Sequence, residues 1–439
     1  MTIRARRRLF YGLFIAFFVL GIGVLVYVNG WRLDVKTFRL RKVGAIFVRS
    51  FPKDTKIFLD NKLIKNESWF LQNGTLVNNL FPKTYELKLE LNNYQPWREH
   101  VSVQPTLVSE LKYAVLVPKN SLLVSTSTVK NFWLLGNDLA VESENDDLVM
   151  GDTKIGKGKI LGWTSDFGNL LMFNPETNAY SWNNLSDARK VNLNALLKRV
   201  GFRLNKDFKI IVDPEDRRRL IILEPRAFSL LDVEQSKLLA VYKTGKNFLE
   251  NIVASQFLFV WTEFNEKQNT SSLVIYDKFL QRTRPSTPTF QGKNLELAWI
   301  KSDKLAVLQD DGALYTYDLP KKEVVKIADD VKNFAFANDG SALAALEHSA
   351  LEVFFFNQDR DYYRFNLPDM GKAEKVVWYV DLNHLFVVYP QYVKFLDLQD
   401  TAVQNFTTVA ETPLARYDEK NNWLYFLVGD RLKKLEFPE

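Results

Sequence analysis

The sequence predicts a mainly β protein: an N-terminal transmembrane helix, a small β-sandwich, and a β-propeller of eight blades, with seven as the alternative. Three observations predict it. Residues 9–28 form an apolar run behind four arginines, residues 44–118 alternate apolar and polar side chains between turn signals, and from residue 131 a repeat begins. Alternation with a period of two is typical of half-buried strands, and a repeat of about 40 residues is typical of four-stranded blades.

The apolar run LFYGLFIAFFVLGIGVLVYV carries no charge. A helix rises about 1.5 Å per residue and needs about 20 apolar residues to cross the hydrocarbon core. The arginines before the run are Arg4, Arg6, Arg7 and Arg8. We expect them to stay in the cytoplasm while the rest of the chain crosses, with Tyr27 and Trp31 at the outer interface.

A cleaved signal peptide is the alternative, and its apolar region usually has about 7–15 residues before small residues at the cleavage site. Here the run is longer and leaves through Tyr27-Val28-Asn29-Gly30-Trp31, without small residues at that spacing. We therefore predict a retained signal anchor: a cytoplasmic basic tail over 1–8, a membrane helix over 9–28, and a juxtamembrane spacer over 29–43.

The charge is concentrated at the N-terminus. The whole chain has a formal charge of +6, but residues 1–42 hold nine Lys or Arg and one Asp, which leaves the remainder near −2. Nucleic-acid binding needs clustered basic residues, so we expect no nucleic-acid partner. The absence of cysteine excludes disulfides, thiolate metal sites and thiol nucleophiles together.

Residues 44–118 read as short strands separated by turns, as in Tyr85-Glu86-Leu87-Lys88-Leu89-Glu90-Leu91. The motifs Ser50-Phe51-Pro52, Phe58-Leu59-Asp60-Asn61-Lys62, Leu80-Phe81-Pro82-Lys83-Thr84-Tyr85 and Asn93-Tyr94-Gln95-Pro96-Trp97 resemble those of the PEGA domain, a small β-sandwich of bacterial surface and membrane proteins. The motif residues are Pro52, Asp60, Pro82, Tyr85, Tyr94 and Trp97. The resemblance implies an envelope-side module without catalytic apparatus.

The PEGA-like motifs depart from the family at several turns. Asn61, Lys83 and Asn93 stand where glycines are expected, and Lys53-Asp54 interrupts the Pro-Glu-Gly-Ala tetrad. Asn and Asp tolerate positive φ better than other side chains, so those turns can survive, whereas Lys83 has no such explanation.

Two markers recur in the remainder of the chain. The first is an apolar stretch that ends in Asp, with clear examples at Asp232, Asp277, Asp318 and Asp397. The second is an aromatic strand that runs into a polar turn, marked by Trp163, Trp299 and Trp378, which we expect to pack between blades. In pattern, as in Asn338-Asp339-Gly340-Ser341, this part resembles bacterial WD40-like and TolB-like propellers.

The markers place units near residues 130, 160, 208, 250, 296, 332, 375 and 414. The last unit has room for three strands only. A strand near 121–126, with Leu122 to Ser125, can supply the fourth and close the ring within a domain over 119–439. Such closure satisfies strand edges that would otherwise lie open.

No catalytic constellation appears in the sequence. Its three histidines, His100, His348 and His384, lack paired spacing, and no nucleophile elbow, Walker loop or usable dinucleotide fingerprint occurs. We therefore predict no catalytic residues, no cofactor and no metal ligands. Thr164 to Leu171 is similar to the Asp-box turn of sialidase-like propellers, but it occurs once.

Fold alone does not decide function, because a propeller can be an enzyme or a platform. The leading hypothesis is a non-catalytic scaffold or recognition protein, anchored in the cell membrane of a bacterium, whose partners are the lipid bilayer and an unknown envelope protein or glycan. The alternative is an extracytoplasmic polysaccharide hydrolase or lyase that uses the propeller funnel, where two carboxylates about 5–10 Å apart would be required.

Overall fold

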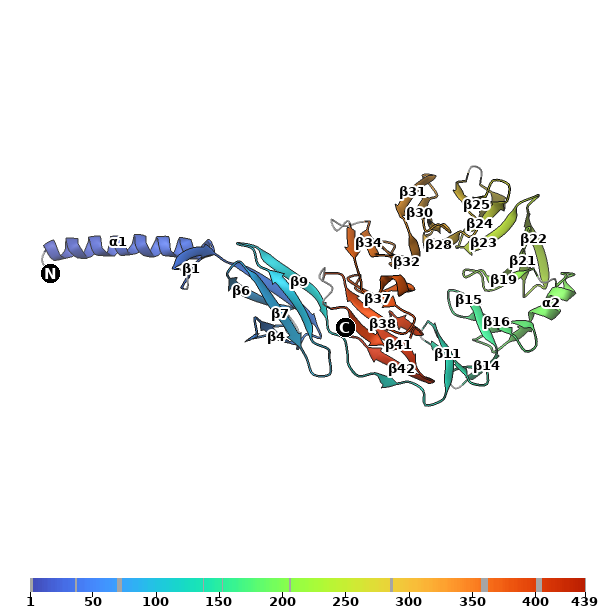
Figure 1. The fold of residues 1–439 in the computed structure, drawn as a ribbon, viewed down its shortest axis with the longest axis horizontal. Coiled ribbons are helices and arrows are strands. Elements are labelled where there is room, and N and C mark those ends of the chain that lie inside the picture. Colours follow the sequence, from blue (N-terminus) through green and yellow to red (C-terminus); the bar gives the residue numbers. More distant parts are fainter. Residues whose placement is uncertain are drawn as a thin grey trace.

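The computed structural model describes residues 3–35, 38–68, 73–136, 138–151, 153–204, 207–284, 287–356, 362–399 and 405–438. Figure 1 shows three parts in a row: an N-terminal helix, a small sandwich, and a ring of sheets. The predicted mainly β fold with one N-terminal apolar helix is confirmed.

Helix α1 (Ile3–Val28) stands clear of the rest of the protein. Its segment Leu9–Val28 has a mean hydropathy of 2.6 and none of it is buried. Among the described residues this is the one helix long and apolar enough to span a membrane. The helix begins at Ile3, so it takes in the arginines that the sequence analysis assigned to a tail.

The predicted spacer forms a hairpin of β1 (Trp31–Asp34) and β2 (Arg39–Lys42), with Trp31 opposite Lys42. Asp34 is buried and its carboxylate lies 3.5 Å from the Arg41 guanidinium. The chain between helix and sandwich is therefore structured over its described residues rather than a free linker.

Two sheets form the sandwich. One has the order β6 (Thr75–Leu80), β3 (Gly44–Phe51), β9 (Val108–Val115); the other has the order β5 (Lys62–Ile64), β4 (Lys56–Leu59), β7 (Thr84–Glu90), β8 (Trp97–Ser102). Strands β3 and β9 run parallel. Tyr85, Leu87 and Leu89 of β7 are buried, because alternate side chains of a strand point to the same face.

The ring consists of eight blades among the described residues, each built on a four-stranded antiparallel sheet and numbered here in chain order. Blade 1 contains β11 (Val129–Leu135), β12 (Asp138–Ser143), β13 (Asp147–Met150) and β14 (Thr153–Lys157), and blade 2 contains β15 (Lys159–Trp163), β16 (Asn169–Asn174), β17 (Ala179–Asn184) and β18 (Lys190–Asn192). Blade 3 contains β19 (Lys209–Val212), β20 (Arg219–Glu224), β21 (Ala227–Asp232) and β22 (Lys237–Lys243), and blade 4 contains β23 (Phe248–Ala254), β24 (Leu258–Asn265), β25 (Thr270–Asp277), β26 (Arg282–Thr283) and β27 (Thr289–Gln291).

Blades 5 to 8 complete the ring. Blade 5 contains β28 (Glu296–Lys301), β29 (Lys304–Leu308), β30 (Leu314–Asp318) and β31 (Glu323–Ala328), and blade 6 contains β32 (Val331–Phe336), β33 (Ala342–Glu347), β34 (Leu351–Phe355) and β35 (Tyr362–Phe365). Blade 7 contains β36 (Lys375–Trp378), β37 (His384–Val388), β38 (Val393–Asp397) and β39 (Thr407–Ala410), and blade 8 contains β40 (Ala415–Asp418), β41 (Trp423–Val428), β42 (Arg431–Glu436) and β10 (Leu122–Leu123). Two short helices lie outside the sheets, α2 (Leu193–Arg199) and the 3₁₀ turn η1 (Met370–Lys372).

An apolar cluster fills the seam between every pair of neighbouring blades, including the seam between blades 8 and 1. First strands of neighbouring blades touch, as β15 does β19 and β11 does β40. Because buried apolar area contributes about 25 cal/mol per Å², these seams hold the blades together as one ring.

Blade 8 joins the two ends of the propeller chain. β10 pairs with β42, with Leu122 opposite Lys434 and Leu123 opposite Lys433. The amide of Val129 then donates to the Asp430 carbonyl at 2.8 Å, which leads the chain directly into blade 1. The outer strand of the last blade thus comes from the segment that follows the sandwich.

Candidate functional site

The sandwich is joined to the seam between blades 7 and 8, here called the junction. Val115 and Val117, at the end of the sandwich, are buried in one apolar cluster with Phe395 and Phe426 of these blades. The Trp97 indole N–H donates to the Asp397 carboxylate at 3.1 Å. Buried apolar and polar contacts therefore hold the sandwich and the propeller in one relative orientation.

A fully buried histidine lies behind Asp397. His384 Nδ1 lies 2.8 Å from Asp381 Oδ2, its Nε2 lies 3.7 Å from Asp397 Oδ2, and its ring stacks on Phe395. Burial alone would lower the pKa of His384, but the two carboxylates outweigh it and raise that pKa to about 10. His384 is thus a cation at neutral pH that compensates the buried carboxylate of Asp397 and the half-buried one of Asp381, which is a structural role.

The seam between blades 3 and 4, here called the distal seam, lies diametrically opposite the junction. Counted in either direction around the ring, it is the fourth seam from the one that receives the sandwich. Figure 1 shows β19 to β25 on the side of the ring away from the sandwich and α1. Its core contains Leu223, Phe228, Phe259 and Trp261. This seam is hollowed at both of its ends.

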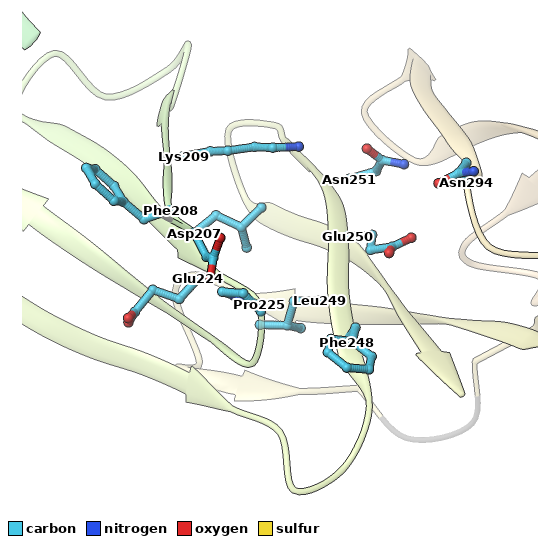
Figure 2. A pocket seen from close by; sticks show the side chains of 11 residues that line it. Asp207, Phe208, Lys209, Glu224, Pro225, Phe248, Leu249, Glu250, Asn251 and Asn294 are labelled. Atoms are coloured by element: carbon cyan, nitrogen blue, oxygen red, sulfur yellow. The ribbon is translucent and has the colours of Figure 1, made fainter. Parts of the chain in front are cut away.

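The first hollow, the face pocket, has a volume of about 440 Å³ and is shown in Figure 2. It lies where β19 and β23 begin, beside the turn that joins β20 to β21. Its lining side chains include Asp207, Lys209, Glu224, Pro225, Phe248, Glu250, Asn251 and Asn294. Carboxylates, amides and one ammonium thus share the pocket with apolar surface, a composition that suits a polar ligand with some apolar area.

Glu250 is the most strongly constrained carboxylate of the face pocket. A break in register of β23 follows it, where Asn251 has φ of 41° and donates to the Leu295 carbonyl at 2.6 Å. Glu250 Oε1 lies 3.5 Å from Lys293 Nζ, whereas Glu250 Oε2 is buried and accepts no hydrogen bond from any described residue. Burial raises the pKa of Glu250 and Lys293 opposes that rise. The unpaired oxygen is an acceptor that a ligand N–H or O–H could use.

The second hollow, the rim groove, has a volume of about 690 Å³ and opens at the other end of the distal seam. Its lining residues include Asp213, Glu215, Asp216, Leu230, Leu239, Phe257, Phe259, Tyr276, Lys278 and Phe279. In blade 3 they come from the β19–β20 turn and from β21 and β22. In blade 4 they come from β24 and β25 and from the β23–β24 and β25–β26 turns. The groove therefore lies between two blades rather than within one.

An ion pair crosses the rim groove. Lys278 Nζ of blade 4 lies 2.6 Å from Asp213 Oδ2 of blade 3, and the two side chains are 19% and 3% exposed. The ammonium also lies 4.3 Å from the ring centroid of Phe259. Burial raises the pKa of Asp213, and the Lys278 charge opposes this rise. The pair thus connects the two blades electrostatically beside the apolar floor.

The blade-repeat aspartates end third strands and cap the following turns. Asp232, Asp277, Asp318 and Asp397 are the last residues of β21, β25, β30 and β38. Each accepts one or two backbone N–H groups of the following turn through Oδ1. The donors are Gln235 for Asp232, Phe279 and Leu280 for Asp277, Lys321 for Asp318, and Gln399 for Asp397. Asx turns of this kind explain why the marker recurs.

The blade-repeat tryptophans lie at ends of first strands or next to them, in the seams. Trp163 packs at the seam of blades 1 and 2, Trp299 at that of blades 4 and 5, and Trp378 at that of blades 6 and 7. The Trp378 indole of blade 7 donates to the Ala335 carbonyl of blade 6 at 2.9 Å. None of these tryptophans lines the face pocket or the rim groove.

The motif residues of the sandwich support its turns and core. The Pro52 carbonyl accepts from Ser50, the Tyr85 hydroxyl donates to the Phe81 carbonyl, and Tyr94 packs against the core. Asp60, with φ of 46°, accepts the Glu86 amide and pairs with Lys83, which directly follows Pro82. Lys83 does not adopt positive φ, so a lysine is tolerated there and its ammonium pairs with Asp60.

The predicted membrane-topology residues lie in or next to α1. Arg4, Arg6, Arg7 and Arg8 fall in its first turns, and Tyr27 in its last. Tyr27 is exposed beneath the Arg32 guanidinium, which lies 3.6 Å from the ring centroid. Trp31 begins β1, with the Lys42 ammonium over its ring.

Sequence reasoning missed the rim groove and the histidine at the junction. The signal for the groove is the pair Phe279-Leu280, two large apolar residues in a turn where polar residues are usual. The signal for the junction is Asp381 three residues before His384, but its meaning depends on Asp397 and Trp97. Within the described ranges, no group of three or more histidines, aspartates or glutamates is arranged to hold a metal ion.

No protein-family model matches this sequence, and no curated protein matches it. Solved structures resemble its fold. A eukaryotic initiation factor has a TM-score of 0.50 and 10% identity over 72% of this chain and 86% of that one. The Dos1 propeller (TM-score 0.45, 12% identity, 72% and 94%) and an oligogalacturonate lyase from Vibrio parahaemolyticus (TM-score 0.43, 12% identity, 72% and 99%) are also similar. At these identities the likeness concerns the fold alone.

Proposed function

We propose that this chain is a membrane-anchored scaffold of the bacterial cell envelope, which holds its propeller outside the cytoplasm and recognises a protein partner at the distal seam. One observation carries the proposal: a seam that is hollowed at both of its ends lies opposite the seam that receives the sandwich. Anchor and recognition surface are thus at opposite ends of the molecule. The resemblance of the sandwich to the PEGA domain supports an envelope location.

The proposed orientation places the N-terminus in the cytoplasm. Four arginines lie within the five positions before the apolar run, while five basic residues follow it within fifteen positions: Arg32, Lys36, Arg39, Arg41 and Lys42. Basic residues near the ends of a span set its orientation. We assign the four arginines the dominant part, because they directly adjoin the apolar run, whereas the second group is spread over residues 32–42.

Site-specific photo-crosslinking in intact cells tests the recognition role. A photoreactive amino acid replaces Gln256 in the rim groove, and a second variant carries it at Leu63, an exposed position of the sandwich. We expect a discrete protein adduct from position 256 and not from position 63. Equal adduct patterns at both positions, or none at position 256, would contradict recognition at the distal seam.

A polysaccharide hydrolase or lyase is the second candidate, and the face pocket favours it. Glu224 and Glu250 both line this pocket, and burial raises the pKa of Glu250, as a general acid requires. The test is depolymerisation of purified envelope polysaccharide by the full chain and by Glu250→Gln. Turnover that the substitution abolishes would establish an enzyme, and absence of turnover in both would dismiss this candidate.

A further inference from the structure

We infer that the rim groove binds a short segment of a partner protein in which a large apolar residue adjoins a basic one. This inference rests on the proposed scaffold function and names the chemistry of the partner. Three exposed side chains mark the site: Phe279 is 87%, Phe257 is 56% and Leu280 is 53% exposed. Clusters of exposed large apolar residues beside a hollow are typical of interaction sites.

The exposed side chains stand on a well-supported platform. The Asp277 carboxylate accepts the backbone amides of Phe279 and Leu280, at 3.1 and 2.9 Å. The Lys278 amide donates to the Phe257 carbonyl at 2.9 Å and so joins the two turns of blade 4. A partner that covers these side chains would therefore order few additional groups, which lowers the entropic cost of binding.

Part of the groove beside this platform is apolar. Leu230 and Leu239 of blade 3 and Phe259 and Tyr276 of blade 4 line it. Its volume of about 690 Å³ falls in the range of about 300–1,000 Å³ that is typical of ligand sites, enough for more than one apolar side chain. Aromatic anchors in such hollows supply most of the energy of many protein interfaces.

One carboxylate of the groove is left to interact with the neighbour of the apolar anchor. Lys278 compensates Asp213, and Arg218 and Arg219 lie 3.9 and 3.7 Å from Asp216. Glu215 is exposed, lines the groove, and forms no ion pair with any described residue. A basic side chain of the partner would complement this carboxylate.

The position of the groove favours a protein over the membrane in which this chain is anchored. Exposed aromatic residues at loop tips could also enter a bilayer. The groove, however, lies on the side of the ring opposite the sandwich and α1 (Figure 1). In this arrangement the anchoring helix and the groove cannot meet one flat bilayer together.

The test uses the full chain in lipid nanodiscs and an array of synthetic nonapeptides with Phe, Leu or Ala at the centre and Lys or Glu next to it. We expect binding of the Phe-Lys and Leu-Lys peptides, with the Ala-Lys and Phe-Glu peptides at least tenfold weaker. Phe279→Ser should weaken binding at least tenfold, and Glu215→Lys should reverse the preference from Lys to Glu. Leu63→Ser, at a 59% exposed position of the sandwich, is the matched control and should bind as wild type does.

Three results would overturn the inference: no preference among the peptides, undiminished binding by the Phe279→Ser variant, or a preference that Glu215→Lys does not change. Two further measurements test whether the groove instead binds a second copy of this chain or lipid. Self-association of nanodiscs that Phe279→Ser abolishes would assign the groove to a second copy, and capture of separate anionic vesicles that it abolishes would assign it to lipid. Peptide failure together with a crosslinked adduct at position 256 would reject this chemistry while leaving the scaffold function standing.

Discussion

The indole N–H of Trp97 donates to the buried carboxylate of Asp397 at 3.1 Å, across the boundary between sandwich and propeller. Asp397 uses its other oxygen to cap the turn after β38, through the Gln399 amide at 2.8 Å, and lies 3.7 Å from His384. A residue of the blade repeat thus also holds the neighbouring domain. The orientation of the propeller relative to its anchor depends on this contact and on the apolar cluster around it.

Trp97→Phe should lower the free energy of unfolding by about 1–3 kcal/mol, because it leaves a buried acceptor without its donor while keeping an aromatic ring. Urea unfolding of the full chain in detergent micelles, followed by far-ultraviolet circular dichroism, measures this. Tyr94→Phe removes from the same sandwich a hydroxyl that forms no hydrogen bond with any described residue, and it should change stability little. Equal effects of the two substitutions would contradict a role for the Trp97 hydrogen bond.

His384→Gln should cost about 3–5 kcal/mol, because it removes the cation between the buried carboxylate of Asp397 and the half-buried carboxylate of Asp381. His348, which pairs with Asp330 at an exposed site, offers the matched control His348→Gln, with a small expected effect. The comparison requires urea unfolding at one pH near neutrality.

The wild-type protein should lose stability as the pH rises from about 6.5 to about 10. The pKa of His384 is raised to about 10, so its stabilising contribution is complete below the unfolded value of 6.5 and disappears as the pH passes the folded value. Unfolding free energies measured across this range should fall with pH, and His384→Gln should flatten the slope. A slope unchanged in that variant would show that other groups cause it.

Lys278→Met should cost about 3 kcal/mol at pH 7, because it leaves the buried Asp213 carboxylate without its cation. The deficit should shrink as the pH falls, since burial already raises the pKa of Asp213 and protonation removes the unpaired charge. Lys321→Met, at a largely exposed pair with Asp318, is the control and should change stability by less than about 0.5 kcal/mol. A deficit independent of pH would assign the loss to packing.

Replacing Arg4, Arg6, Arg7 and Arg8 by Ser should invert a large fraction of molecules, because the five basic residues after the helix then dominate. The chain has no cysteine, so single introduced cysteines report topology directly. Thr126→Cys should be labelled by an impermeant maleimide in intact cells of the wild-type background and protected in the quadruple variant. The control variant replaces Arg39, Arg41 and Lys42 by Ser. It should keep the labelling of the wild-type background.

Sequence patterns predicted those parts of the fold that depend on local chemistry. Each marker aspartate accepts amides from its own turn, as Asp277 does from Phe279 and Leu280, so its signal lies within three residues. First strands therefore begin close to the predicted positions, for example at Lys209 for an expected 208 and at Phe248 for an expected 250. Within the predicted tail and spacer the structure adds regular elements that the sequence analysis did not predict, because their basic residues lie in α1 and in the β1–β2 hairpin.

Sequence patterns did not predict the candidate site. Nothing near Phe279 in the sequence indicates that Phe257 lies beside it, or that Leu230 and Leu239 of another blade complete a groove. Likewise Trp97 was assigned to a sandwich motif and Asp397 to the blade repeat, and their contact joins residues 300 positions apart.

By itself the sequence determined an apolar helix with basic flanks, the alternation of strands, and the spacing of the blades, because hydropathy and turn chemistry act over a few residues. The tertiary structure alone decided which seam receives the sandwich and which seam is hollowed at both of its ends. Those choices depend on how side chains from distant blades fill a shared space. Burial and compensation of charge, as at His384 and Lys278, exist only once the ring is closed.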